Sequence, residues 1–235
     1  NLVGFNKKTI SNYDLANKIV LLRADYNVPI KNGEITDDYR IKQSLPTIEL
    51  LLKKAKAVII CSHLGRPEGK PDSQYSLQPV AKRLSELLKK DVNFVSDCVG
   101  DKASDNAKRL KNGQILLLEN LRFHPGEEEN SKDFAEQLAS LADVFVQDGF
   151  GVVHRAHAST EAITKFLPSV AGLLLEREVS VITETMEQPK RPLMAIVGGA
   201  KISDKIDILN RFIDIADFVA IGGAMANTFL LAEGI

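Results

Sequence analysis

The chain has 235 residues, of which 44% are hydrophobic and 26% charged, a composition typical of a globular protein with one large or two small domains. Its 30 basic and 31 acidic residues leave a formal net charge of -1, so no overall attraction to nucleic acid or to an anionic membrane is expected. No apolar run approaches the roughly 20 residues that span a bilayer, and the polar start Asn1–Lys8 lacks a signal-peptide core. We therefore expect a cytoplasmic protein with neither nucleic-acid nor membrane partners.

Apolar runs alternate with amphipathic stretches along the chain. Most of the apolar runs are continuous, as in parallel strands that helices cover on both faces. The expected strands are Ile19–Ala24, Val58–Ser62, Val92–Val95, Ile115–Leu118, Val144–Gln147, Leu193–Val197 and Phe218–Ile221. The expected helices are Ile41–Lys54, Leu77–Lys89, Ala103–Leu110, Lys132–Leu141 and Ile202–Ile215. This order predicts an α/β fold with a doubly wound parallel sheet in a Rossmann-like, three-layer arrangement.

The interval His154–Arg191 contains no expected strand, and Val170–Glu187 within it is typical of a single helix. Its candidate buried positions are Leu173, Leu174, Val181 and Ile182. We interpret this helix as a connector between a complete first domain and a second domain of which only the beginning is present. The expected division is 1–168 for the first domain, 169–188 for the connector and 189–235 for the start of the second domain.

Polar residues follow several of the expected strands. His63 and Arg66 lie in Ser62–Pro67, directly after one apolar run, and Arg23–Pro29 follows another. Because the carboxyl ends of parallel strands lie along one edge of a sheet, these loops converge there. Arginine suits such a place, since its planar fork binds phosphate or carboxylate through two parallel bonds. Further arginines near the ends of strands or turns are Arg40, Arg122 and Arg155. A pocket for a small polyanion is the favoured interpretation, and ordinary surface arginines are the alternative.

The turn Gly198–Lys205 follows the expected strand Leu193–Val197. The amides at the start of the expected helix, together with Lys201 and Lys205 on one helix face, could hold the phosphates of a nucleotide. The sequence of this turn matches neither a Walker A loop nor a dinucleotide-binding fingerprint. A tight strand-to-helix turn with solvated lysines is therefore the alternative.

Three other features of the sequence argue against a metal site. Cys61 and Cys98 have no neighbouring ligands at zinc spacing, so we expect two reduced packing thiols. Arg155, between His154 and His157, would repel a cation held by that pair. The acidic segment Gly126–Asn130 is interpreted as a solvated turn.

Taken together, the motifs resemble those of the phosphoglycerate kinase family over essentially the whole chain. In chain order they are Arg23–Pro29, Ser62–Pro67, Leu118–Phe123, His154–His157 and Gly198–Lys201. The resemblance implies a monomeric, two-domain hinge enzyme of glycolysis. It would transfer a phosphoryl group between 1,3-bisphosphoglycerate and magnesium ADP, giving 3-phosphoglycerate and ATP. The amino-terminal domain would bind the glycerate and the carboxyl-terminal domain the nucleotide.

The resemblance also implies roles for residues of the glycerate site. Asp25 and Asn27 resemble the residues that orient the glycerate hydroxyl and carboxylate. Arg40 resembles the arginine that meets the transferring phosphoryl group. The residues that resemble the basic patch on the phosphate that is not transferred are His63, Arg66, Arg122 and Arg155.

Four residues would bind the nucleotide by the same resemblance. Lys205 matches a lysine at the nucleotide phosphates that steadies the transferring group, and Lys201 resembles a second lysine there. Gly198 and Gly199 belong to the same phosphate-binding turn. Phosphoryl transfer needs positioned cations and in-line geometry rather than a covalent nucleophile, which agrees with these roles.

The sequence departs from the family pattern in places. Tyr26 stands where phenylalanine is usual, and Gly149 with Val152 and Val153 replaces an alanine and small polar residues. The chain ends at Ile235, so we expect the magnesium-binding aspartate and the adenine pocket to be absent from it. The favoured hypothesis is part of a kinase, and the alternative is a non-catalytic domain that binds 3-phosphoglycerate. A nucleotide-dependent oxidoreductase is disfavoured, because the dinucleotide fingerprint is missing.

Overall fold

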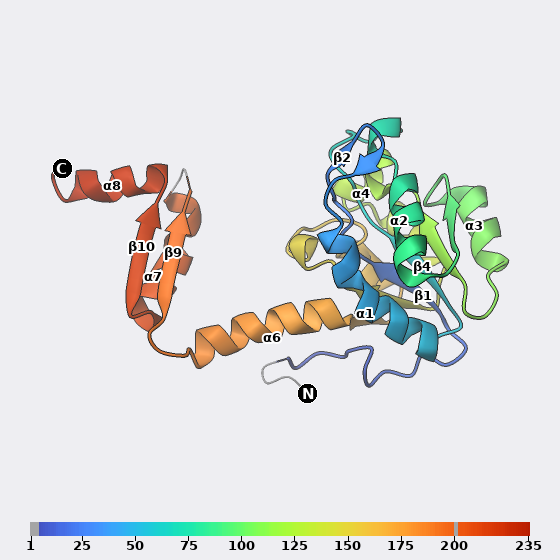
Figure 1. Cartoon of the computed structure of the whole chain (residues 1–235), viewed down its shortest axis with the longest axis horizontal. Coiled ribbons are helices and arrows are strands. Elements are labelled where there is room, and N and C mark those ends of the chain that lie inside the picture. Colours follow the sequence, from blue (N-terminus) through green and yellow to red (C-terminus); the bar gives the residue numbers. More distant parts are fainter. Residues whose placement is uncertain (1–4, 200–201) are drawn as a thin grey trace. The chain divides into compact units, whose positions relative to one another are not determined.

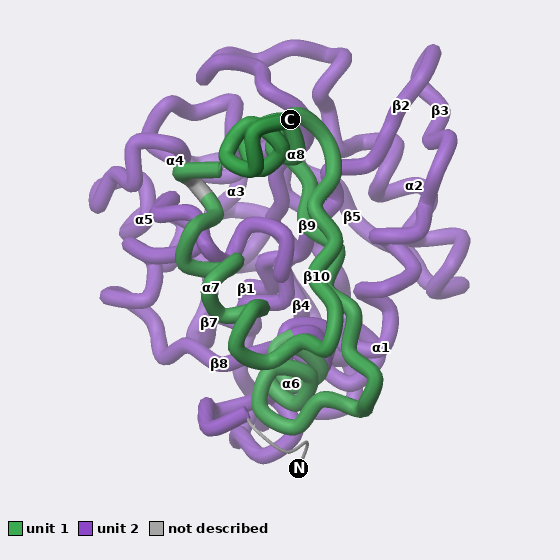
Figure 2. The backbone as a smooth tube through the Cα atoms, turned by 90° about the vertical axis from the view of Figure 1, so that its left-hand side faces the viewer, with its two compact units in different colours: residues 1, 3, 179–235 green, residues 2, 4–178 purple. Residues whose placement is uncertain are grey.

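The structure is a computed structural model that describes residues 5–199 and 202–235 (Figure 1). The chain divides into two compact units, which Figure 2 distinguishes: unit 2 ends at Glu178, and unit 1 extends from Val179 to Ile235. This boundary falls inside the range 169–188 expected for the connector, while the three-part division itself stays a prediction. Among the described residues, no helix combines the length and the apolar character needed to cross a membrane.

Unit 2 is built on a six-stranded parallel sheet with the order β5-β6-β4-β1-β7-β8. A short antiparallel hairpin of two further strands stands apart from this sheet. The sheet strands are β1 Ile19–Arg23, β4 Ala57–Cys61, β5 Val92–Val95, β6 Ile115–Leu118, β7 Val144–Gln147 and β8 Ser169–Ala171, and the hairpin strands are β2 Ile30–Lys31 and β3 Glu34–Ile35. The predicted parallel α/β fold is confirmed.

Helices cover both faces of this sheet. They are α1 Tyr39–Lys54, α2 Gln78–Leu88, α3 Gly100–Lys108, α4 Pro125–Glu128 and α5 Lys132–Ala139, with 3-10 turns η1 Ser73–Tyr75, η2 Leu121–Phe123, η3 Phe150–Val152 and η4 Ala162–Lys165. In β1, Val20 and Leu22 join the core under α1 and α2, whereas Leu21 joins the core under α3 and α5. Successive side chains of a strand point to opposite faces, so a continuous apolar run fills both cores.

The segment before the connector differs from the prediction. Val170 belongs to β8, where it pairs with Val146 of β7, and the helix α6 spans Leu173–Glu187. Gly172 separates the two elements, and a Cβ atom there would lie 2.2 Å from Oδ1 of Asp148. The Gly172 N–H still donates to the Gln147 carbonyl of β7 at 2.9 Å, and the Asp148 carboxylate leaves no space for a side chain at this position. An edge strand of three residues is too short to interrupt a helical pattern in the sequence.

Two of the buried positions predicted for α6 are wrong. Val181 and Ile182 are 55% and 47% exposed, whereas Leu175 is buried. At the start of the helix, Asp148 Oδ1 accepts hydrogen bonds from the backbone N–H groups of Leu174 and Leu175, at 2.9 and 3.1 Å. These contacts satisfy two of the amides that every helix leaves unpaired at its amino end.

Unit 1 contains a separate two-stranded parallel sheet of β9 Met194–Gly198 and β10 Phe218–Gly222. The rest of this unit comprises the end of α6, the 3-10 turn η5 Ser203–Lys205, and the helices α7 Ile206–Ile215 and α8 Ala224–Ala232. Val197 packs with Leu209 of α7 and Met225 of α8, while Ile196 is exposed on the opposite face. Within the described residues, these strands are thus covered on one face only. The α-helix expected from Ile202 begins at Ile206 instead.

The first prediction concerns the buried carboxylate that holds the start of α6. Burial raises the pKa of Asp148 from its ordinary value of 3.8 to about 6. The folded chain therefore binds more protons than the unfolded chain between about pH 4 and pH 6, and its stability falls as the pH rises through that window. The loss is complete above pH 6 and amounts to about 3 kcal/mol.

Asp148→Asn keeps an acceptor oxygen for the two amides but cannot ionise. We expect urea unfolding to show that the free energy of unfolding of the wild type decreases by about 3 kcal/mol more than that of the variant between pH 4 and pH 7. All other titrating groups are common to both proteins, so the difference between their two pH profiles isolates Asp148. Profiles that run parallel would contradict the assignment.

Candidate functional site

The carboxyl ends of β1 and β4 bring Arg23 and His63 together. Arg23, the last residue of β1, is fully buried, and its Nη2 lies 3.2 Å from Nδ1 of His63. Because a guanidinium has only donors, the Nδ1 atom of His63 accepts this bond and the ring hydrogen lies on Nε2. Burial lowers the pKa of His63 to about 2, and the positive charges of Arg23, Arg122 and Arg40 act in the same direction. His63 is therefore a neutral hydrogen-bond donor at physiological pH.

The counter-charge of buried Arg23 comes from the acidic segment that was predicted to be solvated. Ser159 Oγ accepts a hydrogen bond from Arg23 Nε at 2.8 Å and donates one to Glu127 Oε1 at 2.5 Å. The Ser159 N–H also donates to Glu127 Oε2 at 3.0 Å. Glu127 is fully buried in α4, so the predicted solvated turn is wrong at this residue. A buried charge needs a hydrogen-bonded partner, and only the fold shows which one Arg23 has.

Asp25, Asn27 and Arg40 form a second connected group beside this cluster. Arg40 Nη1, from the first turn of α1, donates to both carboxylate oxygens of Asp25, at 2.9 and 3.0 Å. Asp25 Oδ1 accepts from the N–H of Asn27, whose own Oδ1 accepts from the N–H of Gly65 at 2.9 Å. Gly65 has a φ of +61°, and a Cβ atom there would lie 2.3 Å from the Tyr75 ring. Only glycine therefore permits this turn after β4.

A cavity of about 190 Å³ opens beside the ion pair of Asp25 and Arg40. It is lined in part by Asp148 and Phe150, which follow β7, and by Tyr39 of α1. Asp148 Oδ2 is buried and has no hydrogen-bond partner among the described residues. The cavity thus brings polar groups from the ends of β1 and β7 into one space.

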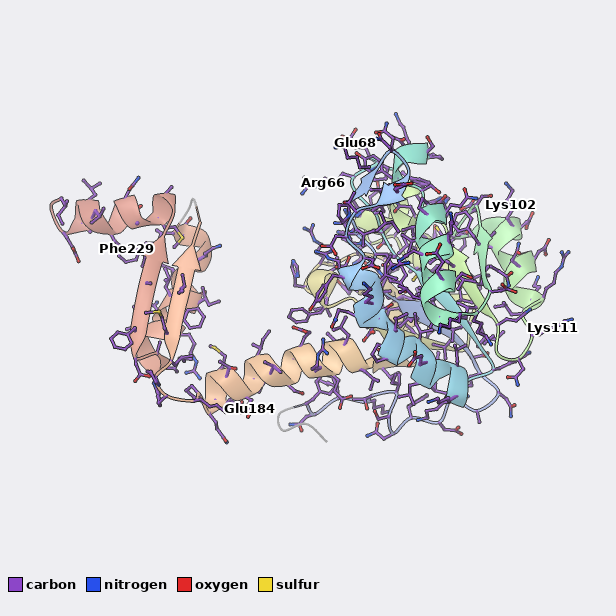
Figure 3. All side chains as sticks on the ribbon, viewed as in Figure 1. Arg66, Glu68, Lys102, Lys111, Glu184 and Phe229 are labelled. Carbon is purple, nitrogen blue, oxygen red and sulfur yellow. The ribbon has the colours of Figure 1, made fainter. Side chains whose placement is uncertain are left out.

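The remaining basic residues differ in how they are held. Arg122 is buried in η2, and its Nη1 donates to the carbonyl of Gly65 at 2.9 Å. Arg66 and Arg155 are exposed, and Figure 3 labels Arg66 on its loop after β4. Within residues 5–199 and 202–235, neither of these two side chains has a hydrogen bond or an ion pair. The charge of Arg155 helps to lower the pKa values of Arg122 and His157, although burial is the largest cause for both.

Unit 1 places Lys205 over the glycine turn that follows β9. A Cβ atom on Gly199 would lie 3.2 Å from Cε and 3.4 Å from Nζ of Lys205. Gly223, after the neighbouring strand β10, has a φ of +68°, and a Cβ atom there would lie 3.1 Å from the Gly199 carbonyl oxygen. The two turns therefore form a close-packed backbone cradle beside an ammonium group, next to Gly198. Lys201 lies outside the described residues.

A family model described as "Phosphoglycerate kinase" matches residues 10–235 of the chain. Among curated proteins, the phosphoglycerate kinase of Pelotomaculum thermopropionicum is 52% identical over 228 residues, and that of Desulforudis audaxviator is 54% identical over 229 residues. Each alignment covers 97% of this chain and 58% of the relative. The chain thus spans little more than half the length of these relatives.

Solved structures of phosphoglycerate kinases match the fold as well. The enzyme from Coxiella burnetii is 43% identical with a TM-score of 0.83, and the alignment covers 97% of this chain and 57% of that one. The enzyme from Pyrococcus horikoshii is 33% identical with a TM-score of 0.84. That alignment covers 97% of this chain and 58% of the Pyrococcus chain.

The neutral state of His63 can be tested directly. A histidine in an unstructured peptide titrates near pH 6.5, whereas the lowered pKa of His63 places its titration far below that value. We expect the ring nitrogen shifts of His63, measured by NMR, to stay constant from pH 8 to pH 5 and to show hydrogen on Nε2. A titration of this ring near pH 6.5 would contradict the assignment. Because only the unfolded chain takes up this proton below about pH 6.5, His63 lowers stability as the pH falls.

Proposed function

The chain belongs to the phosphoglycerate kinase family, and we propose that it serves reversible phosphoryl transfer from 1,3-bisphosphoglycerate to magnesium ADP, giving 3-phosphoglycerate and ATP in glycolysis. The observation that carries the proposal is the gathering of His63, Arg23 and Arg122 beside the ion pair of Asp25 and Arg40 at one edge of the sheet. The proposal includes a cytoplasmic monomer with small-molecule substrates. It keeps the division 1–168, 169–188 and 189–235, with the connector as the hinge between two binding domains.

We assign the glycerate end of the substrate to unit 2. 3-Phosphoglycerate carries about three negative charges at pH 7, so several unpaired donors must face it. Within the described residues, Arg66 and Arg155 are exposed with free guanidinium groups, and Arg122 adds a nearby positive charge, although its Nε lies 3.5 Å from Oε1 of Glu128. Together with the neutral donor His63, these side chains suit the phosphate that does not move. Asp25 and Asn27, fixed to each other and to Gly65, suit the glycerate hydroxyl and carboxylate.

Arg40 is the residue that we assign to the transferring phosphoryl group. Its side chain is half exposed, and Asp25 holds it through one nitrogen, which leaves its other donors without a partner among the described residues. A fixed cation stabilises the charge that spreads over the phosphoryl oxygens in the transition state. In the reverse direction the acceptor is the carboxylate of 3-phosphoglycerate, which is already ionised, so the reaction needs no general base. Lys205 would supply a second cation from the nucleotide side.

The nucleotide site fits the proposal as far as the described residues extend. The turns of Gly198, Gly199 and Gly223 pack closely beside Lys205, whose ammonium group would neutralise the charge of a phosphate group bound there. A bound ADP with magnesium supplies the phosphoryl acceptor and the divalent charge that offsets its phosphates. No described residue is assigned to the magnesium ion or to the adenine.

The phosphate assignment predicts a loss of binding when either exposed arginine is truncated. One charge-assisted hydrogen bond is worth about 1.5–3 kcal/mol, so Arg66→Ala or Arg155→Ala should weaken 3-phosphoglycerate binding roughly 10- to 100-fold. Isothermal calorimetry at low salt measures this, since screening weakens the interaction as salt increases. Arg109→Ala, which removes an exposed arginine at the end of α3, is the matched control and should bind like the wild type. Equal affinity in all four proteins would refute the site.

The assignment of Arg40 predicts a different pattern in a full-length protein that contains this chain. Arg40→Ala should lower kcat roughly 100- to 1,000-fold and change KM much less, because its contact strengthens mainly in the transition state. Arg40→Lys keeps the charge without the planar fork and should recover only part of the rate. An equal loss in kcat and in apparent affinity would indicate simple substrate binding instead.

A further inference from the structure

Asp97, Cys98 and His124 meet at the carboxyl edge of the sheet, outside the basic cluster. Asp97 and Cys98 follow β5, and His124 follows β6 and the turn η2. The register of these neighbouring strands pairs Val95 with Leu118 at their carboxyl ends, so the two loops leave the sheet side by side. One ligand atom from each of the three residues lies within 4.8 Å of the other two.

We propose that Asp97, Cys98 and His124 bind a zinc-type divalent cation at a site separate from the magnesium of the nucleotide. A thiolate, an imidazole and a carboxylate are the ligands that Zn²⁺ prefers, whereas Mg²⁺ is bound through oxygen atoms. Three protein ligands leave one position of a tetrahedral site open for water. Ligand spacing along the chain does not predict this group, because His124 is distant in sequence from the other two residues.

The contacts present without an ion already hold the ligands in place. His124 Nε2 lies 2.8 Å from Asp97 Oδ1, and the same oxygen accepts from the N–H of Cys98 at 2.7 Å. The His124 ring packs against Phe134, with the ring centroids 5.4 Å apart. The packing against Phe134 restricts the rotation of the imidazole, as outer contacts do around known metal ligands, and the cation would replace the hydrogen bond between His124 and Asp97.

Two of the three proposed ligands are accessible from solvent, and the third, the Cys98 sulfur, is buried outside the lining of the hollow beside them. Cys98 is fully buried, but the side chains of Asp97 and His124 are 38% and 34% exposed. Both of these residues line a hollow of about 580 Å³, together with Ser96, Glu119 and Phe123. An ion can therefore enter from solvent, meet the carboxylate and the imidazole, and keep a water molecule on the open side.

Binding must release the proton of the Cys98 thiol. Burial raises the pKa of Cys98 well above its ordinary value, with the charge of Asp97 acting in the same direction. The free site therefore holds a neutral thiol, and the cation replaces its proton when the sulfur becomes a ligand. The affinity for the cation should increase with pH for this reason.

Cobalt(II) is a suitable probe, because Zn²⁺ itself has no visible spectrum. Titration of Co²⁺ into the chelator-treated 235-residue chain should produce a thiolate-to-cobalt charge-transfer band that saturates at one equivalent and disappears when Zn²⁺ is added. Cys98→Ser should abolish the band. Cys61→Ser removes the other buried cysteine, on β4, and should leave the band intact.

A second variant keeps the test decisive if Cys98→Ser fails to fold. His124→Gln changes a partly exposed ring and should weaken Co²⁺ binding at least roughly tenfold, in line with the effects of disturbed metal ligation. The wild type should also bind more tightly at pH 8 than at pH 6. No charge-transfer band in the wild type, a band that depends on Cys61, or unchanged affinity in His124→Gln would each overturn the proposal.

Discussion

The pairing of Arg23 with Glu127 through Ser159 is the interaction on which the carboxyl edge of unit 2 depends. Both charged groups are fully buried, and an uncompensated charge there would cost several kcal/mol. Ser159 accepts from one and donates to the other, which joins the end of β1 to α4 and to the segment after η3. Arg23 then has a nitrogen left for His63, and that contact fixes the tautomer of the ring.

This arrangement separates residues that build the site from residues that are free to bind. Arg23 has its contacts within the fold, so its charge contributes to the local potential without a free fork for a ligand. Arg66 and Arg155 are exposed, and their guanidinium groups have no hydrogen bond or ion pair among the described residues. Arg40 lies between these two groups of arginines: Asp25 orients its side chain, but only through one nitrogen. A neutral His63 adds a donor without adding repulsion among these cations, which is why its lowered pKa suits the site.

Five of the six strands of the main sheet could be predicted, because their apolar residues fill the cores on both faces, whereas β8 was missed because it has only three residues. The hairpin of β2 and β3 was missed although Asn32 and Gly33, both with positive φ, are a recognisable turn pair. Glu127 could not be predicted as buried, because its burial depends on a distant arginine rather than on local pattern.

The loop after β6 shows how one turn can serve two different neighbours. In the sheet, β6 lies between β4 and β5, so residues beyond Leu118 are within reach of both adjoining loops. Asn120 accepts from the N–H of Arg122 and thereby fixes the start of η2. Arg122 lies within η2, whereas His124 follows the turn in an extended conformation, with φ of -110° and ψ of 128°. Arg122 accordingly contacts Gly65 after β4, whereas His124 contacts Asp97 after β5. The same short segment can thus supply a cation for a phosphate on one side and an imidazole for a metal ion on the other.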